Sequence, residues 1–305
     1  MVEVVVAEAP RGHVLCIGIE RAIEQVRKTV RGRGEVLSFE PAHELELRAR
    51  GEKLLAGVSA IEATMEEVHA HFPELERVRM VTDLESVPDG AVLAISARGV
   101  PPSVLARAKE RGLAIVQGTC PYVLSQEHYA KGLVKEGYDI VYCGSPEQHG
   151  VPRLRDIAES AGRRFFIAEH AADVDAVPRM KRAGVMAQTT QSRENLREVV
   201  GRLLEKCHEV KVVNSICDDA IPRQEAARRV AEQVDVMLVL GESWGASRMF
   251  EVCQRANARV YRAVRPQQLR PEWLAGATKV GIAAGNAVPE WVVPAFVARV
   301  REVAR

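Results

Sequence analysis

The fold is decided by a stretch that reads Val212-Val-Asn-Ser-Ile-Cys217-Asp-Asp-Ala-Ile-Pro-Arg-Gln224. An apolar run with the character of a β-strand ends in a cysteine there, and a helix-like segment follows. The same layout surrounds Cys16 and Cys120, and each time another apolar run begins about 20 residues after the cysteine. The cysteines lie about 100 residues apart, close to a third of the 305-residue chain. The sequence therefore predicts three equivalent α/β units, each with one cysteine at the carboxyl end of a strand.

Strand-like and helix-like segments alternate along the whole chain, which favours parallel sheets covered by helices. We expect the first unit to span 1–119, the second 120–213 and the third 214–288, with a C-terminal helix over 289–305 packing back on the first unit. Within the first unit we expect a strand over 13–17 before its cysteine and a long helix over 42–70.

The overall composition excludes several classes of protein. The net charge is +1 and no long basic block occurs, so nucleic acid and anionic membranes are not expected partners. No run approaches the roughly 18 apolar residues of a membrane span, and we expect a cytoplasmic protein. Six cysteines in 305 residues are no disulfide framework, and such spaced cysteines more often serve metal binding or catalysis.

Small polar turns are expected at the same rim as the cysteines. In parallel α/β sheets ligands bind at the carboxyl ends of strands, and helix amino termini there offer N–H groups to anions. We expect these turns to line a site. They follow two equivalent strands of each unit: Ser38–Pro41, Gly144–Glu147 and Gly241–Gly245, then Ser96–Gly99, Gln188–Ser192 and Ala284–Pro289.

Three converging thiols have three interpretations. Three thiolates hold a [4Fe-4S] cluster by three corners and leave the fourth iron open, although such clusters are usually held by four cysteines. Three protein ligands and a water molecule make a catalytic zinc site. The third interpretation is that the thiols are buried and inert, as free cysteines often are. The other cysteines are expected in the core, Cys143 in a strand and Cys207 and Cys253 in helices.

Short motifs spread over almost the whole chain narrow this choice. Their order and spacing resemble the 4-hydroxy-3-methylbut-2-enyl diphosphate reductase family, also called IspH or LytB. The motifs are Cys16-Ile-Gly-Ile-Glu-Arg-Ala-Ile, Val87-Pro-Asp-Gly, Ser96-Ala-Arg-Gly-Val, Thr119-Cys-Pro, Gly144-Ser-Pro-Glu, Gln188-Thr-Thr-Gln-Ser, Ser215-Ile-Cys-Asp-Asp-Ala, Arg223-Gln224 and Gly281-Ile-Ala-Ala-Gly285.

The resemblance implies an α/β trefoil of three units in pseudo-threefold arrangement around a central [4Fe-4S] cluster. It implies that Cys16, Cys120 and Cys217 bind the cluster, and that two electrons remove an allylic hydroxyl group. Glu147 would match the family's proton donor, and Thr189 the threonine that hydrogen-bonds the hydroxyl. Electrons would come from a small donor such as ferredoxin or flavodoxin.

Departures from the family pattern concern the groups that bind diphosphate. The family's His-Asn pair is replaced near Phe39-Glu40, with only His43 close by, its Ser-Ala-His-Gly carries Arg98, and its Gly-His-Pro-Glu carries Ser145. In the third unit the family's Asn-Ser-Ser-Asn run is replaced by Ser243-Trp-Gly-Ala-Ser247, and its Gly-Ala-Ser by Gly285-Asn286-Ala287. Because these ligands change in all three units, we expect a paralogous reductase whose small-molecule substrate is not the usual allylic diphosphate. The alternatives are the orthodox diphosphate reductase, a cluster-bearing sensor or electron carrier, and a zinc hydrolase. We assign substrate binding to Arg98, Ser145, Gln188, Ser243 and Asn286, with Trp244 and His149 as further candidates.

Overall fold

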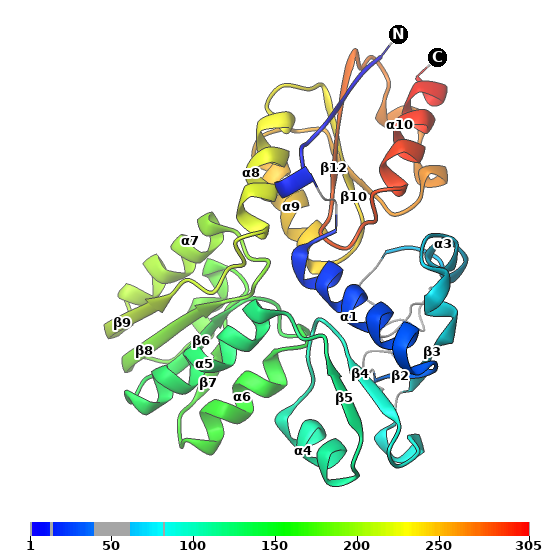
Figure 1. Ribbon diagram of the computed structural model, residues 1–305. Helices are drawn as coiled ribbons and strands as arrows, with labels where there is room; N and C mark the ends of the chain where they lie inside the picture. Colours follow the sequence, from blue (N-terminus) through cyan, green and yellow to red (C-terminus); the bar gives the residue numbers. More distant parts are fainter. Residues whose placement is uncertain (1, 13–14, 40–61, 82, 305) are drawn as a thin grey trace.

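The structure is a computed structural model that describes residues 2–12, 15–39, 62–81 and 83–304. Three lobes meet at the centre of the molecule, and each contains one parallel sheet with helices against it (Figure 1). This arrangement confirms the predicted trefoil of three α/β units. Glu40 and His43, and the part of the expected helix before residue 62, lie outside the described residues.

Each sheet has four parallel strands in the same spatial order. The first strand of each unit lies between the second and the third, and one further strand forms the edge beside the third. The sheets are β3 (Val78–Val81), β2 (Val36–Phe39), β4 (Val92–Ile95) and β5 (Ala114–Gln117); then β7 (Phe165–Ile167), β6 (Asp139–Cys143), β8 (Met180–Ala187) and β9 (Cys207–Val213); and finally β11 (Val260–Ala263), β10 (Val236–Leu240), β12 (Lys279–Ala284) and β1 (Glu3–Val6).

The chain ends correct our expectation about the first unit. β1 pairs with β12, with Glu3 opposite Lys279, so it completes the third sheet and not the first. The C-terminal helix α10 (Val292–Val303) packs on β1 and β12 and therefore also belongs to the third lobe, not to the first unit. In the other units the edge strand follows the last helix. In the third lobe β1 takes that position beside β12.

Burial of both faces explains the apolar composition of the central strands. All five residues of β10 are completely buried, and successive side chains point to opposite faces. Val236, Leu238 and Leu240 pack in one apolar cluster with α10. Met237 and Val239 face the opposite way and pack in a second cluster with α8 (Ala220–Ala231) and α9 (Trp244–Gln254). A strand covered by helices on both faces is therefore a continuous hydrophobic run and shows no alternation.

The helices also differ from expectation in three places. Residues 15 and 16 are not a strand, because α1 begins at Ile17. Residues 62–64 interrupt the expected helix 42–70, since Thr64 caps α3 with its side chain. Cys207 begins β9 and is not helical. The other helices are α1 (Ile17–Arg33), α3 (Met65–His71), α4 (Pro102–Glu110), α5 (Pro121–Lys135), α6 (Val151–Ser160), α7 (Arg193–Leu204), α8 (Ala220–Ala231) and α9 (Trp244–Gln254).

Short 3₁₀ turns join several of these elements, at Pro10–Gly12, Pro73–Arg77, Leu84–Ser86, Ala171–Ala176, Pro266–Gln268 and Pro271–Trp273.

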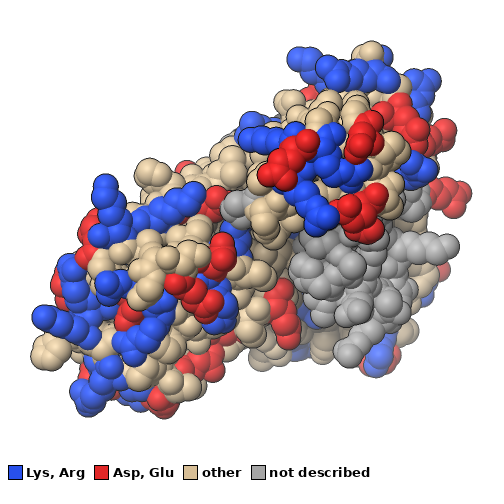
Figure 2. Space-filling model, turned by 90° about the horizontal axis from the view of Figure 1, so that it is seen from below, with Lys and Arg blue, Asp and Glu red and all other residues tan. Residues whose placement is uncertain are grey.

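On the face shown in Figure 2, basic and acidic side chains are interspersed. Exposed ion pairs of this kind contribute little to stability, about 0–1 kcal/mol each, so the three cores carry the fold. Among the described residues, no α-helix combines the length and the apolar character that crossing a bilayer requires.

Candidate active site

Each of the three cysteines lies where the chain crosses from one sheet to the next unit. β1 leads to Cys16 and α1, β5 leads to Cys120 and α5, and β9 leads to Cys217 and α8. The backbone N–H groups of the cysteines donate to equivalent carbonyl groups, which lie two residues beyond the ends of β12, β4 and β8. The acceptors are Asn286 at 3.0 Å for Cys16, Ala97 at 2.9 Å for Cys120 and Thr189 at 2.8 Å for Cys217. This repeated contact fixes each cysteine at the carboxyl end of a strand.

The cysteine side chains converge on one space. A Cβ atom built on Gly18, in the first turn of α1, would lie 2.7 Å from Cys120 Sγ and 3.9 Å from Cys16 Sγ. Cys217 interacts electrostatically with both of the other thiols, which raises its pKa further. The absence of a side chain at Gly18 is therefore what allows two crossings to approach each other.

Burial dominates the acidity of these thiols. It raises the pKa of Cys16, Cys120 and Cys217, the last to about 12, although N–H groups of the following helix turns donate to each sulfur and lower it in part. Buried thiols of this kind stay protonated at neutral pH. A bound metal removes the proton of a coordinating thiol outright, so these sulfurs fit a metal group better than a free nucleophile.

The spacing of the sulfurs bears on which metal group fits. Within the described ranges, no three His, Cys, Asp or Glu side chains lie close enough to bind one ion together. One zinc ion with sulfur ligands at 2.3 Å would need sulfurs about 4 Å apart. In an iron–sulfur cluster each thiolate binds a different iron atom, so the ligands stand further apart. Three thiols from three units that line one cavity fit the donor set of such a cluster.

A cavity of about 140 Å³ lies at this junction, and all three cysteines line it. Eight of the ten site residues expected from the sequence line the cavity: Cys16, Cys120, Cys217, Arg98, Gln188, Thr189, Ser243 and Asn286. Trp244 and His149 line it as well. Four of the six expected turns therefore contribute to one site, whereas no residue of Gly144–Glu147 and neither Ser38 nor Phe39 lines the cavity.

Two expected residues do not line the cavity. Ser145 is buried, and its backbone N–H donates to Gln188 Oε1 at 3.0 Å. Glu147 is exposed, while the next residues, Gln148 and His149, line the cavity. Gln188 itself is held on both sides, because its Nε2 donates to Thr190 Oγ1 at 2.9 Å. Its side chain therefore supports the turn that carries Thr189.

A chain of polar contacts connects Cys16 to the amino terminus of α9. Asn286 Nδ2 lies 3.9 Å from Cys16 Sγ, and Ser243 Oγ donates to Asn286 Oδ1 at 3.4 Å. The Glu62 carboxylate in turn accepts from the backbone N–H groups of Glu242 at 2.6 Å and Ser243 at 2.8 Å. Sequence analysis missed Glu62, which lies far from any motif.

Burial of the Glu62 carboxyl group makes the stability of the folded protein depend on pH. Burial raises the pKa of the Glu62 carboxyl above its ordinary value of 4.5, although the Ser243 and Glu242 donors offset part of the rise. The stability that this group contributes is therefore complete below pH 4.5 and is lost as pH rises through the raised pKa. Relative to Glu62→Gln, we expect the wild type to gain stability as pH falls from 8 toward 4.5, by at most about 1.4 kcal/mol per pH unit. Urea unfolding at several pH values measures this difference.

The control for this prediction is Glu242→Gln, which neutralises an exposed neighbouring carboxyl group. It should show a much smaller pH-dependent difference from the wild type. Unfolding free energies of wild type and Glu62→Gln that run parallel over the whole pH range would refute the prediction.

Several residues of the third unit that were not assigned to the site also line the cavity. Asp219 and Arg223 form a buried ion pair at 3.0 Å, and both line the cavity. Gln224 Nε2 donates to the carbonyl groups of Thr190 and Gln191 at 3.0 and 3.2 Å. Gln224 therefore joins the second and third units at the site. The signal that could have found them is the charged pair on the otherwise apolar face of a helix.

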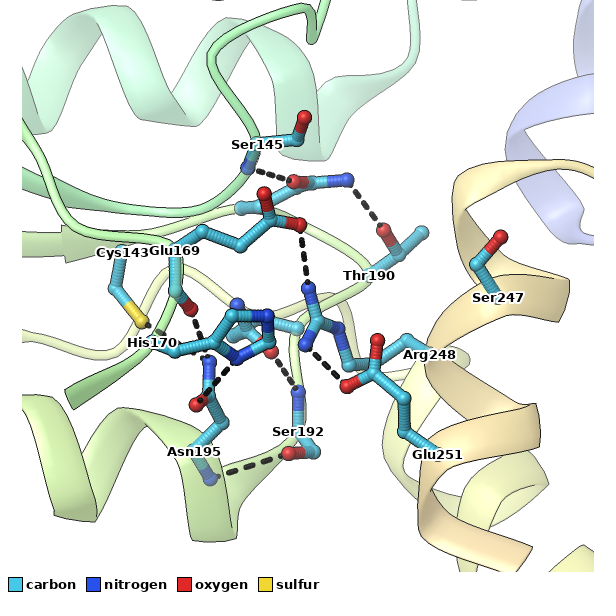
Figure 3. A network of polar contacts seen from close by, with 12 residues as sticks. Cys143, Ser145, Glu169, His170, Thr190, Ser192, Asn195, Ser247, Arg248 and Glu251 are labelled. Carbon is cyan, nitrogen blue, oxygen red and sulfur yellow. Dashed lines mark hydrogen bonds and ion pairs between the residues drawn. The ribbon is translucent and has the colours of Figure 1, made fainter. Parts of the chain in front are cut away.

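A polar network also crosses the junction of the second and third lobes (Figure 3). Arg248 of α9 is 5% exposed and contacts Glu169 at 3.2 Å and Glu251 at 2.5 Å. The Glu169 carbonyl accepts from Asn195 Nδ2 at 2.6 Å, and Asn195 Oδ1 lies 3.4 Å from His170 Nδ1. Arg248 therefore ties α9, the helix that Ser243 caps, to the neighbouring lobe.

Comparison with known proteins agrees with this arrangement. A profile of the LytB protein family matches residues 5–301. The chain is 35% identical over 228 residues to the 4-hydroxy-3-methylbut-2-enyl diphosphate reductase of Pelobacter propionicus, covering 74% of this chain and 80% of that protein. The reductase of the same name from Geobacter sulfurreducens is 31% identical over 290 residues, 94% of each chain.

Solved structures show the same fold. The structure of (E)-4-hydroxy-3-methyl-but-2-enyl diphosphate reductase matches with a TM-score of 0.62 and 26% identity, over 99% of this chain and 100% of that one. The E-1-hydroxy-2-methyl-but-2-enyl-4-diphosphate reductase of Plasmodium falciparum matches with a TM-score of 0.77 and 22% identity, over 97% and 87%, a likeness of fold alone. The family resemblance found in the motifs is thus confirmed, and the chain belongs to the LytB family.

Proposed function

We propose that this chain is a 4-hydroxy-3-methylbut-2-enyl diphosphate reductase that holds a [4Fe-4S] cluster on Cys16, Cys120 and Cys217. The observation that carries the proposal is the convergence of three thiols, from equivalent crossings of three units, on one cavity. Relatives that bear this name match most of the chain, and their activity is what we propose for it.

In the proposed reaction the allylic C–O bond of the substrate breaks as two electrons enter. The hydroxyl group takes up one proton and leaves as water, and a second proton adds to carbon, giving isopentenyl or dimethylallyl diphosphate. A bound cluster would supply single electrons and one iron atom without a cysteine ligand. A small donor such as ferredoxin or flavodoxin would deliver the electrons one at a time.

The residues of the chain would bind and orient the substrate around that group. Thr189 is half-buried at the cavity and offers a hydroxyl group to the leaving hydroxyl. Glu147 as proton donor remains our prediction, and it requires the exposed side chain to turn into the cavity. Arg98, Ser243 and Asn286 line the same cavity and supply donors to an anionic substrate.

The expectation of a different substrate has no support. It rested on the loss of diphosphate ligands at single motif positions such as Ser145. The cavity lining nevertheless contains three arginines, Arg98, Arg153 and Arg223, and one aspartate, Asp219. A positively charged lining favours an anionic substrate, and the relatives are named for the diphosphate. The orthodox reading is therefore the better supported one.

A sensor or an electron carrier has less support than an enzyme. Neither function needs a cavity beside the metal group, whereas an enzyme needs space for its substrate. Here the cavity directly adjoins the three thiols and is lined by polar groups from all three units.

Anaerobic turnover tests the proposal. Protein with a reconstituted cluster is expected to convert 4-hydroxy-3-methylbut-2-enyl diphosphate to isopentenyl and dimethylallyl diphosphates with dithionite as reductant. Product analysis by mass spectrometry measures this conversion. Full cluster content without any turnover of this substrate would reject the orthodox activity and return the question to a paralogous reductase.

A further inference from the structure

Arg153 is a buried arginine at the cavity that no motif singled out. It lies in the first turn of α6, is 4% exposed and lines the cavity. Its Nη1 atom approaches Gly99, where an added Cβ atom would lie only 2.8 Å away. Gly99 has a φ of +75°, a conformation that glycine adopts without strain. The turn that carries Arg98 thus brings its backbone against the Arg153 guanidinium.

The guanidinium group of Arg153 is not fully hydrogen-bonded. Nε lies 2.9 Å from Glu127 Oε1, but the geometry is that of an ion pair and not of a hydrogen bond. Within the described part of the chain, neither Nε nor Nη2 makes a hydrogen bond, although both are shielded from water. Buried polar groups nearly always have such partners, and a buried guanidinium without them is costly. The position therefore suits a ligand that supplies acceptor oxygens.

The charges around Arg153 make an anion the fitting ligand. Arg223 is already paired with the buried Asp219, so this pair adds no net charge. Glu127, 18% exposed, lies beside Arg153 but does not itself line the cavity. Arg98, the residue directly before Gly99 in the chain, also lines the cavity. A planar guanidinium offers two parallel N–H donors, which match two oxygens of one phosphate group.

We propose that Arg153 binds a phosphate group of the substrate's diphosphate, together with Arg98, which lines the same cavity. This inference rests on the proposed function for the identity of the substrate. It assigns to a helix residue of the second unit the diphosphate contact that the motif positions lack.

A purely structural role for Arg153 makes a different prediction. The contact with Glu127 joins α5 to α6, so the pair could serve only to hold these two helices together. In that case Glu127→Gln and Arg153→Gln would have the same consequences. If Arg153 binds the anion, Glu127→Gln leaves the guanidinium in place and does not weaken anion binding.

The experiment measures binding of inorganic pyrophosphate to anaerobic, cluster-loaded protein by calorimetry, with inorganic phosphate as a second probe. Arg153→Gln is expected to weaken pyrophosphate binding on the order of 10- to 100-fold, and to raise KM for the diphosphate substrate similarly with little change in kcat. Arg153→Lys should fall between, because it keeps the charge but loses the paired donors. The matched control is Arg155→Gln on the same helix, which removes an exposed arginine paired with Glu159.

The outcomes separate this inference from the proposed function. Unchanged pyrophosphate affinity in Arg153→Gln, with normal thermal unfolding, overturns the role of Arg153 even if the wild type turns over its substrate. Equal weakening by Glu127→Gln and Arg153→Gln overturns it too, in favour of the helix-joining pair. Arg153-dependent pyrophosphate binding in a wild type that does not turn over the substrate supports the anion site and rejects only the proposed reaction.

Discussion

Cys120→Ser is expected to abolish the brown absorbance of anaerobically purified protein and all measurable reductase turnover. Cys120 ends the crossing between the first and second units, and its sulfur faces the same space as Cys16. A serine hydroxyl is a poor ligand for iron in a cluster that thiolates hold. Loss of a residue that only hydrogen-bonds to a metal ligand typically lowers metal affinity about 10- to 100-fold, so we expect loss of the ligand itself to lower it more. Iron and sulfide analysis, with the absorbance spectrum, measures the result.

Cys207→Ser is the matched control for this change. Cys207 is half-buried at the start of β9 and does not line the cavity. We expect this variant to keep its cluster and its turnover. Full retention of iron in Cys120→Ser would refute the ligand assignment, and equal losses in both variants would point to general instability of the protein.

Gly18→Ala is expected to be nearly as damaging, although it removes no ligand. The new methyl group would lie 2.7 Å from Cys120 Sγ and 3.0 Å from its Cβ. Cys120 has little freedom to move, since its N–H donates to Ala97 and Pro121 begins α5 directly after it. Overpacking costs about 1–3 kcal/mol, and a displaced ligand lowers cluster affinity by at least about 10- to 100-fold. Iron content and thermal unfolding measure both effects.

Gly32→Ala on the same helix provides the control, because nothing lies within 4 Å of a Cβ atom built there. This substitution should leave the iron content unchanged and stabilise α1 by about 0.5–1 kcal/mol. A Gly18→Ala protein with normal iron content would mean that the two crossings tolerate a wider separation than the structure shows.

The sequence was informative wherever one local pattern repeats. Cysteines after apolar runs, followed by helices, predicted three equivalent units and three converging thiols without any long-range information. The polar turns at strand ends, such as Ser96–Gly99 and Gln188–Ser192, also line the predicted site. Both signals are local and recur three times, so each copy supports the others.

The features that the sequence did not predict depend on distant contacts. Which sheet β1 joins is decided by pairing with β12, and no local property of Glu3–Val6 encodes that partner. Arg153 was missed because its neighbour Gly99 comes from another unit. The orientation of Glu147, one residue before the cavity-lining Gln148, depends on the path of a single turn. Single-position comparison also missed a positively charged group at the cavity, Arg153, because it comes from α6 and from no motif position.

The position of β1 at the edge of the third sheet has a consequence for synthesis on the ribosome. The strand precedes its partner β12 by 276 residues, counted from Glu3 to Lys279. At about 5–20 residues per second, Glu3–Val6 must wait roughly 15 to 55 s before it can pair. All described strands of the first and second lobes are made before β12, so the third lobe closes last. Until then a short strand with three consecutive valines lacks its partner, and it depends on chaperones or on its own brevity to avoid pairing with other chains.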